Sequence, residues 1–378
     1  MSLGGHPYDS RGPHMKVVLI SGHDAAAGRK TGFHFWAEIL DQRGIEVDFI
    51  TVGSSRISLY KKNGKQLRPP FNTWVSMPGK WRRYTWLPPF HPINFSSRIL
   101  NYLSWPLFSF YPLMMPEELK SIRNVDLFIV ESGGGPLLVP QLAKRNPKAK
   151  FIYNFSDRKG VVDFHPYVVR QTEKNLSYFS MIRLNAAVVA NDFPSDLPTV
   201  YIPQAIDKAL FDRKTPNPYT KPKNAINIGD MLFDAKSVAI MAEKFPDWTF
   251  HLFGRGARME SPIANVIEHG EKPFDNIVPY LQHADIGLAP YGVTKEDTGY
   301  LSQSSLKLVQ YTYCRLPIVT PQFATKDRPH AFGYTPGIEA TIVHAFEQAM
   351  QCDRSSIDVS GVYNWDQVID RMLEVIKT

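Results

Sequence analysis

The chain has 378 residues, of which 43% are hydrophobic and 21% charged, as is typical of a soluble globular protein with two or three domains. Its two cysteines, Cys314 and Cys352, stand outside any CxxC or Cys/His cluster, so neither a disulfide framework nor a zinc site is expected. Residues 1–14 lack an apolar core and are expected to be a disordered tail or an expression remnant rather than a signal peptide.

From residue 15 onward, short apolar strands alternate with longer helical patterns. Strands are expected at 16–21, 46–51, 127–130, 150–155, 186–190 and 199–203, and a helix at 33–43. Such alternation is typical of parallel βαβ units, in which the residues after each strand meet at one edge of the sheet. Residues 15–210 are therefore predicted to form one domain of this kind.

A second alternation begins after a break. Residues 211–224, FDRKTPNPYTKPKN, are polar and rich in proline and form the predicted linker. Strands are then expected at 225–228, 249–253, 266–269, 286–289 and 317–321, and helices at 235–244, 275–283, 304 onward, 338–351 and 365–376. Residues 225–352 are the predicted second domain, and 353–378 should pack back on the first. The fold class is α/β, with two doubly wound Rossmann-like domains facing across a ligand cleft.

The positive charge lies in one segment. Between Phe49 and Pro116 there are nine Lys or Arg and no Asp or Glu, so the net charge of +7 leaves −2 elsewhere (+7 minus +9). The uncharged run 99–116, ILNYLSWPLFSFYPLMMP, is too short and too often interrupted by proline to span a bilayer. A plain structural role and nucleic-acid binding are possible readings, but an anionic membrane surface is favoured. The side chains predicted to face it are Trp81, Arg82, Arg83, Trp86, Arg98 and Trp105.

The region 284–316 predicts an anion site. A buried strand and a polar loop lead into a helix that opens at Ser304 and Ser305. Lys307 stands in the first helical turn, where the dipole disfavours a cation and free N–H groups favour an anion such as a diphosphate. Gln310 shares a face with Lys307. The opposite face is predicted to pack into the core: Leu306, Val309 and Tyr313.

Three neighbouring strand ends carry glycine or polar residues. The segments that follow these three strands are 229–234 (GDMLFD), 254–256 (GRG) and 270–272 (GEK). The GRG turn lacks the third glycine of the dinucleotide fingerprint, so NAD is not favoured. Glu271 stands where ribose or sugar hydroxyls would be bound, and Tyr291 stands opposite Lys307. Any one of these positions could be ordinary turn chemistry, but their accumulation at neighbouring strand ends indicates a ligand site.

In the first domain, Asp157 follows the strand at 150–155 and would face the cleft as the general base for an acceptor hydroxyl. His23, Asp24 and Glu131 follow neighbouring strands and compete for that role. No DxD pair occurs, so no metal ligand set is expected. A lysine at a helix N-terminus can stabilise a leaving nucleoside diphosphate without metal.

These pieces together resemble a known family. The motifs that carry the likeness are SGHD (21–24), ESG (131–133), SD (156–157), GDMLFD (229–234), WTFHLFGRG (248–256), HGEK (269–272), ADIGLAPY (284–291), SSLKLVQY (304–311) and FGYTPG (332–337). They are similar to the GumK-like, membrane-associated inverting β-glucuronosyltransferases of xanthan-type exopolysaccharide assembly. The resemblance implies a GT-B fold and metal-independent transfer of glucuronate from UDP-glucuronate. The acceptor would be a polyprenyl-diphosphate-linked oligosaccharide, and the chain a peripheral protein on the cytoplasmic face of the inner membrane.

By position, Asp157 matches the family's catalytic base. The positions that match its UDP-sugar site are Met231, Glu271, Tyr291, Lys307 and Gln310. Two neighbours differ: Lys272 replaces a methionine and Arg158 a glycine, which concerns the sugar pocket and the acceptor side. Lys272 or Lys307 could pair with a glucuronate carboxylate. The alternatives are a UDP-sugar 2-epimerase-like enzyme, a transferase with another nucleotide-sugar, and a non-catalytic nucleotide-sugar sensor.

Overall fold

The computed structural model describes residues 15–27, 30–59, 67–156, 164–292 and 299–377. The chain divides into two compact units. The first contains Met1–Leu184, Val189–Ile202 and Trp365–Thr378, and the second contains Asn185–Val188 and Pro203–Asn364. The division at Ile202 lies earlier than the linker expected at 211–224, and the segment before Trp365 stays with the second unit.

The first unit is built on an eight-stranded sheet in the order β3-β4-β2-β1-β5-β6-β7-β8. The strands are parallel except for β3, which runs antiparallel to β4. Its strands are β1 (Lys16–Ser21), β2 (Glu46–Thr51), β3 (Trp74–Ser76), β4 (Arg82–Thr85), β5 (Leu127–Glu131), β6 (Lys150–Phe155), β7 (Met181–Leu184) and β8 (Thr199–Tyr201). Buried apolar runs such as Val17–Ile20 fill β1 and β5, as expected for strands covered on both faces.

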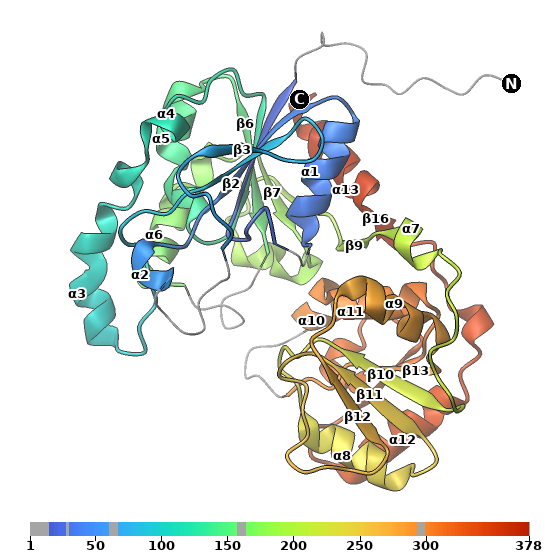
Figure 1. The fold of residues 1–378 in the computed structure, drawn as a ribbon. Coiled ribbons are helices and arrows are strands. Elements are labelled where there is room, and N and C mark those ends of the chain that lie inside the picture. The colour runs from blue at the N-terminus through green and yellow to red at the C-terminus, as the bar shows by residue number, and fades with distance from the viewer. Residues whose placement is uncertain (1–14, 28–29, 60–66, 157–163, 293–298, 378) are drawn as a thin grey trace, which may run out of the picture. The chain divides into compact units, whose positions relative to one another are not determined.

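Helices pack on both faces of this sheet (Figure 1). The α-helices are α1 (Gly32–Gln42), α2 (Arg56–Leu59), α3 (Arg98–Ser109), α4 (Glu117–Lys120), α5 (Val139–Arg145), α6 (Pro166–Lys174) and α13 (Trp365–Leu373). The 3₁₀ turns are η1 (Pro112–Met114), η2 (Gly135–Leu137), η3 (Leu176–Tyr178) and η7 (Glu374–Ile376), while η4 (Ala187–Asp192) crosses the division between the units.

Helix α13 lies beside α1, although the whole second unit separates them in sequence (Figure 1). Its buried residues Trp365, Val368, Ile369 and Met372 form one apolar stripe. Trp365 stacks on Phe35 with ring centroids 5.4 Å apart and planes 10° apart. At the edge of this contact, Arg43 is paired with Asp366 at 3.1 Å and with Asp370 at 2.7 Å. The helix therefore completes the core of the first unit.

The second unit has a six-stranded parallel sheet in the order β12-β11-β10-β13-β14-β15. Its strands are β10 (Asn224–Ile228), β11 (Thr249–Phe253), β12 (Val266–Gly270), β13 (Ile286–Leu288), β14 (Ile318–Pro321) and β15 (Ala331–Tyr334), with a separate pair β9 (Ala205–Ile206) and β16 (Tyr363–Asn364). Its helices and turns are α7 (Lys208–Phe211), α8 (Ala235–Lys244), α9 (Phe274–His283), α10 (Tyr300–Ser304), α11 (Leu306–Tyr313), η5 (Gln322–Ala324), α12 (Glu339–Met350) and η6 (Arg354–Ser356).

One predicted strand is wrong. Residues 187–190 of the predicted strand form part of η4, and the strand of this region is β7, a few residues earlier. A short apolar run does not by itself distinguish a strand from a helical turn. Strand β7 was hidden because it contains Arg183, which is buried and donates to Asn154 Oδ1 at 2.7 Å.

Candidate functional site

In the second unit, the glycine turns after β10 and β11 pack against each other. Gly254 has a φ of +139°, and a Cβ added there would lie 3.1 Å from the backbone carbon of Gly229. The Gly256 N–H donates to Asp230 Oδ2 at 2.8 Å, which holds the two turns together. Because only glycine fits this approach, the turns expose backbone at the carboxyl edge of the sheet.

Lys307, in the first turn of α11, reaches this edge. Its Nζ donates to Asn227 Oδ1 at 3.1 Å and lies 5.1 Å from the centroid of the Tyr291 ring. Burial lowers the pKa of Lys307 to about 7, with Asp230 acting in the opposite direction. Among the described residues Lys307 forms no ion pair. A desolvated amine without a carboxylate partner at a helix N-terminus would gain from a bound anion.

The helix start itself is built slightly differently from the prediction. Helix α10 ends at Ser304 and α11 begins at Leu306, with Ser305 as the residue between them. The Ser305 and Tyr291 hydroxyls are hydrogen-bonded at 2.5 Å, which fixes the Tyr291 ring under the Lys307 amine. Lys307, Tyr291 and Ser305 are thus brought together as the sequence predicted.

The predicted core face of this helix is partly wrong. Leu306 is 37% exposed, whereas Leu308 and Tyr311 are fully buried. The Tyr311 hydroxyl reaches under the sheet, where it accepts from the Ile228 N–H at 3.0 Å and donates to Leu288 O at 2.9 Å. Gln310 is buried too, at 7% exposure. The helix is rotated relative to the prediction because Tyr311 serves as a strut between β10 and β13.

The remaining predicted residues of this unit lie on the adjoining loops. Glu271 pairs with Arg255 Nη2 at 2.8 Å, and both side chains are exposed. Met231 is 48% exposed on the turn after β10. Lys272 is exposed as well, and no acidic side chain of the described residues pairs with it. Arg255 and Asn227 were missed from the sequence, since only the fold shows which residues they contact.

In the first unit, Glu131 at the end of β5 accepts hydrogen bonds from residues at the ends of β1 and β6. Its Oε2 accepts from the Ser21 hydroxyl at 2.5 Å and from the Gly22 N–H at 3.0 Å. Its Oε1 accepts from the Ser156 hydroxyl at 3.2 Å and lies 3.7 Å from His23 Nε2. The structure thus brings His23 and Glu131 together beside Ser156. Asp157, the residue that follows, lies outside the described residues.

Asp24 does not join this group. Its side chain is 5% exposed, and both oxygens accept backbone N–H groups, Oδ2 from Arg68 at 2.7 Å and Oδ1 from Ala26 at 3.1 Å. Such a carboxylate is already satisfied by local hydrogen bonds. Asp24 therefore serves the loop structure, which corrects its prediction as an acceptor-side base.

Three predicted membrane-facing residues are buried. Trp81, Arg83 and Trp86 are 4%, 4% and 2% exposed. They flank or belong to β4, which pairs with β2 inside the sheet. Arg83 donates to Arg68 O at 3.1 Å and to Pro69 O at 2.9 Å, so its charge is used internally. These three residues cannot contact a membrane in this structure.

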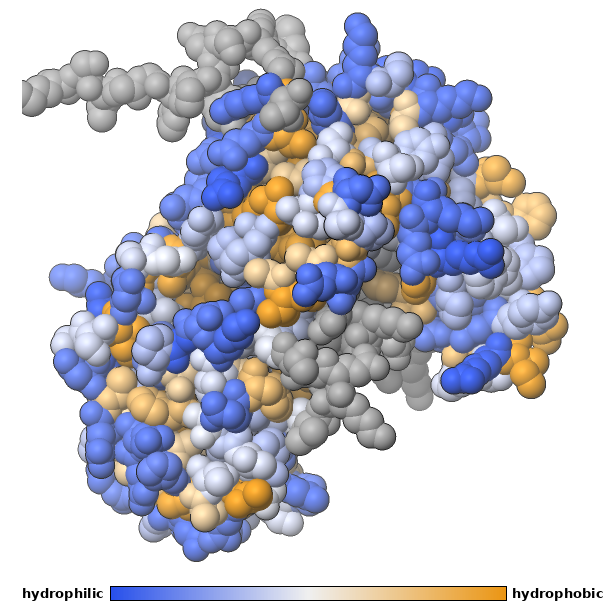
Figure 2. All heavy atoms as spheres, turned by 180° about the vertical axis from the view of Figure 1, so that it is seen from behind, coloured by the Kyte–Doolittle hydropathy of each residue, from blue (hydrophilic) through white to orange (hydrophobic). Residues whose placement is uncertain are grey.

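The other three predicted residues are more accessible. Arg82 is 42% exposed but pairs with the buried Asp48, and Trp105 packs edge-on against Tyr167 at 5.6 Å. Arg98 is exposed at the start of α3. The helix that follows turns an apolar face outward, visible as hydrophobic side chains on the edge of the first unit (Figure 2). Its exposed apolar members are Ile99, Leu100, Tyr102, Leu103 and Leu107, and the C-cap residue Phe110 is exposed as well.

Within the described ranges, no helix combines the length and the hydropathy needed to cross a bilayer. Nor do three His, Cys, Asp or Glu side chains of the described residues come together in a way that could hold a metal ion.

Comparison with known proteins adds sequence relatives. A family model described as "Glucuronosyltransferase GumK, N-terminal domain" matches residues 19–185. A UDP-glucuronate:glycolipid 2-beta-glucuronosyltransferase from Xanthomonas campestris pv. campestris is 30% identical over 361 residues, which cover 94% of this chain and 89% of the relative.

Solved structures give the fold. A UDP-forming trehalose-phosphate synthase from Burkholderia xenovorans aligns with a TM-score of 0.62 at 10% identity, covering 96% of this chain and 99% of that one. AviGT4, a glycosyltransferase of avilamycin A biosynthesis, aligns with a TM-score of 0.54 at 14% identity, covering 96% and 97%. At such identities the likeness establishes the fold alone, which is the two-domain α/β arrangement of GT-B glycosyltransferases.

Proposed function

The chain belongs to the GumK glucuronosyltransferase family and is a glycosyltransferase, and from that premise we propose an inverting, metal-independent reaction. Glucuronate would move from UDP-glucuronate to a polyprenyl-diphosphate-linked oligosaccharide during exopolysaccharide synthesis. The relative named for a glycolipid acceptor supports this donor and this class of acceptor.

The observation that carries the proposal is the Lys307 amine above the Tyr291 ring. It lies at the start of α11, whose first-turn N–H groups have no acceptor within the helix, beside the glycine turns after β10 and β11. A diphosphate bound there would receive backbone N–H groups and a charge-assisted hydrogen bond from Lys307. The same contacts would stabilise the negative charge that develops on UDP as the sugar leaves, and no metal is needed for this.

On the acceptor side, Asp157 would remove the proton from the acceptor hydroxyl. The hydroxyl oxygen forms a bond to the anomeric carbon, while the bond from that carbon to the UDP oxygen breaks on the opposite face. The configuration of the sugar is thereby inverted, the proton passes to Asp157, and UDP leaves. The His23–Glu131 pair is the alternative base, because Glu131 can hold His23 in one orientation.

The donor sugar is assigned from charge. Lys272 is exposed without an acidic partner among the described residues, and it follows Glu271 on the turn after β12. A glucuronate carboxylate would pair with Lys272 or Lys307, whereas a neutral hexose would not.

A lipid-linked acceptor would be met at a membrane surface. We infer a peripheral position on the cytoplasmic face of the inner membrane, supported by the outward apolar face of α3.

Thermal unfolding with UDP, UDP-glucuronate, UDP-glucose and GDP-mannose tests the donor site. A ligand at about a hundred times its Kd adds roughly 2.7 kcal/mol of stability, and we expect the largest effect with UDP-glucuronate. Lys307→Met should remove this effect. Lys244→Met, which deletes an exposed lysine at the C-terminus of α8, is the control and should keep the stabilisation. Stabilisation by GDP-mannose alone would overturn the donor.

Transfer to a detergent-solubilised lipid-linked acceptor then tests the reaction. Conversion of UDP-glucuronate without an acceptor would identify an epimerase instead.

A further inference from the structure

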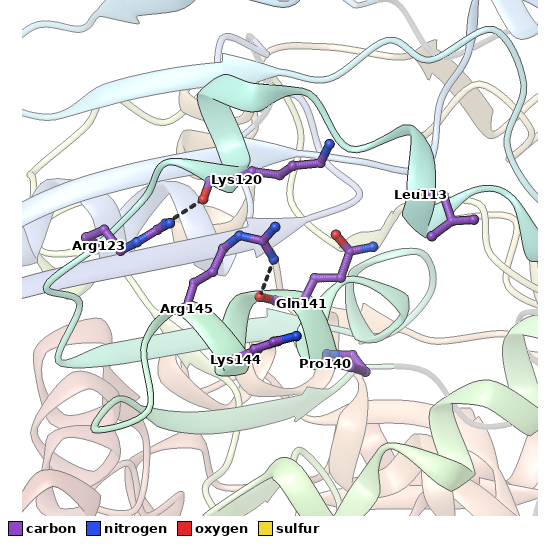
Figure 3. Close-up of a pocket in the computed structure, with 7 residues that line it drawn as sticks. All are labelled: Leu113, Lys120, Arg123, Pro140, Gln141, Lys144 and Arg145. Carbon is purple, nitrogen blue, oxygen red and sulfur yellow. Dashed lines mark hydrogen bonds between the residues drawn. The ribbon is translucent and has the colours of Figure 1, made fainter.

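A basic groove lies in the first unit, between α4 and α5. The cavity has a volume of about 790 Å³. Four cations line it, Lys120, Arg123, Lys144 and Arg145, together with Leu113 and Gln141. In Figure 3 the side chains of Arg145 and Gln141 reach from α5 toward α4.

Most of this charge is not neutralised by the protein. Lys120 pairs with Glu117 at 2.8 Å, and that glutamate is 85% exposed. Arg123 donates to the backbone oxygens of Lys120 and Ile122, and Arg145 donates to Gln141 O at 3.0 Å. Within the described part of the chain, no carboxylate pairs with Arg123, Lys144 or Arg145. Carbonyl contacts orient the two guanidinium groups but leave their charge available to an anion.

The groove borders on η1, and α3, which precedes η1 in the chain, also carries exposed apolar side chains. Leu113, on its rim, is 65% exposed, and Ile99, Tyr102 and Leu103 are 71%, 78% and 66% exposed. The inner side of α3 is fixed to the unit, because Phe108 packs edge-on against His165 at 4.8 Å. An ordinary surface helix is polar on its outer side, whereas here the outer side is apolar.

We propose that this groove binds the phosphate headgroup of an anionic membrane lipid while the outer side chains of α3 and Leu113 enter the acyl region. Arginine and lysine bind phosphate by charge-assisted hydrogen bonds, and apolar side chains beside a basic cluster match the two layers of a membrane surface. This inference rests on the proposed function only for the presence of a membrane, since its residues take no part in donor binding or transfer.

The experiment is co-sedimentation of the full chain with phosphatidylcholine vesicles, prepared with and without about 30% of the anionic lipid phosphatidylglycerol. The groove variant is Arg123→Gln with Lys144→Gln, which replaces two exposed side chains. We expect it to lose binding to the anionic vesicles by about tenfold to thirtyfold, because each cation near such a surface contributes roughly a fivefold gain. Binding to pure phosphatidylcholine should stay unchanged.

The matched control removes the same charge elsewhere on the unit, with Lys80→Gln and Lys174→Gln, both exposed. We expect a loss of no more than about threefold, from the general field alone. Ile99→Ser with Leu103→Ser should weaken binding to both kinds of vesicle. Equal losses in the groove variant and the control would overturn the proposal, as would wild-type binding by the groove variant.

Transfer to a detergent-solubilised acceptor separates this idea from the proposed function. A groove variant that transfers glucuronate normally but binds anionic vesicles like the wild type refutes the headgroup site alone. A chain that transfers no glucuronate, while its groove variant still loses anionic vesicles selectively, refutes the reaction and supports the headgroup site.

Discussion

The Lys307 amine and the Asn227 amide oxygen lie 3.1 Å apart at the carboxyl edge of the second unit's sheet. Asn227 is fully buried, and its own amide nitrogen donates to Gly229 O at 3.0 Å, so it accepts from Lys307 in one fixed orientation. The amide holds the amine without neutralising it. An anion that enters beside Gly229 therefore meets a positioned group whose charge depends on pH.

The first prediction is proton uptake on donor binding. Because the pKa of Lys307 is lowered to about 7, the free protein carries mostly the neutral amine at pH 8. A diphosphate favours the charged form, so binding at pH 8 should take up close to one proton, and at pH 6 almost none. Above pH 7 the affinity for UDP-glucuronate should fall by up to about tenfold per pH unit.

Calorimetry in two buffers of different ionisation enthalpy measures this uptake. Burial lowers the pKa of His251 and His330 to about 4, so these two imidazoles stay neutral across the range. Lys307→Arg is the control, since an arginine remains charged and should show no uptake. Binding by the wild type at pH 8 without a proton would contradict the prediction.

The same shift affects folding, which is the second prediction. The folded pKa of Lys307 lies below its usual value of 10.5, so the unfolded chain binds more protons between about pH 7 and 10.5. The contribution of this group to stability should therefore rise with pH through that window and stay constant below it. Urea unfolding of the wild type and of Lys307→Met at pH 7 and pH 9 isolates the effect, because the methionine variant lacks the titration.

The third prediction concerns the acceptor base. Asp157→Asn should lower the transfer rate by about a hundredfold to ten-thousandfold while the stabilisation by UDP-glucuronate is kept. Glu131→Gln should have a smaller effect, through misplacement of Ser21 and Ser156. If His23→Gln removes transfer and Asp157→Asn does not, the base is the histidine held by Glu131.

The fourth prediction concerns the sugar. Lys272→Met should reduce the preference for UDP-glucuronate over UDP-glucose by roughly tenfold, because one charge-assisted hydrogen bond is lost. Competition binding of the two donors gives this ratio directly. An unchanged ratio would leave Lys307 as the partner of the carboxylate.

The fifth prediction is structural. Tyr311→Phe removes the hydroxyl that accepts from Ile228 N and donates to Leu288 O, and leaves these buried groups with one partner fewer. We expect a loss of about 1–3 kcal/mol in the free energy of unfolding. Tyr313→Phe is the matched control, because that hydroxyl bonds Asp212 at the surface at 2.7 Å and its loss should cost about 1 kcal/mol or less. Equal losses of unfolding free energy in the two variants would contradict a stabilising role for the buried Tyr311 hydroxyl.

Much of the parallel framework was predictable from the sequence. Strands β1, β2, β6 and β11 begin and end at the predicted residues, because each is an apolar run of ordinary length with polar residues at its ends. The proposed nucleotide site was predictable in part, since Tyr291 follows β13 directly and Lys307 stands in the first turn of α11, the second helix after that strand. Their fixing partners were not, because Asn227 lies inside a strand and Ser305 reaches Tyr291 only in the folded chain.

The basic segment misled the prediction for a related reason. Composition identifies a cluster of tryptophan and arginine but not which way each one points. Strand β4 pairs with β2 inside the sheet. As a result, Trp81 packs on Phe49, and the Arg83 guanidinium donates hydrogen bonds to backbone oxygens. The outward apolar side chains belong to α3, most of which lies in the uncharged run 99–116 that the sequence relates to a membrane surface, although only Arg98 and Trp105 of this helix were predicted to face it.

The position of α13 sets the order in which the protein can be completed during synthesis. The first unit needs Trp365 against Phe35, yet residues 203–364 leave the ribosome between them. At about 5–20 residues per second, this interval is on the order of ten seconds or more. For that time the apolar side of α1 is uncovered, while the second unit receives all of its strands. Until α13 emerges, the apolar side of α1 in the nascent chain is open to chaperones and to aggregation.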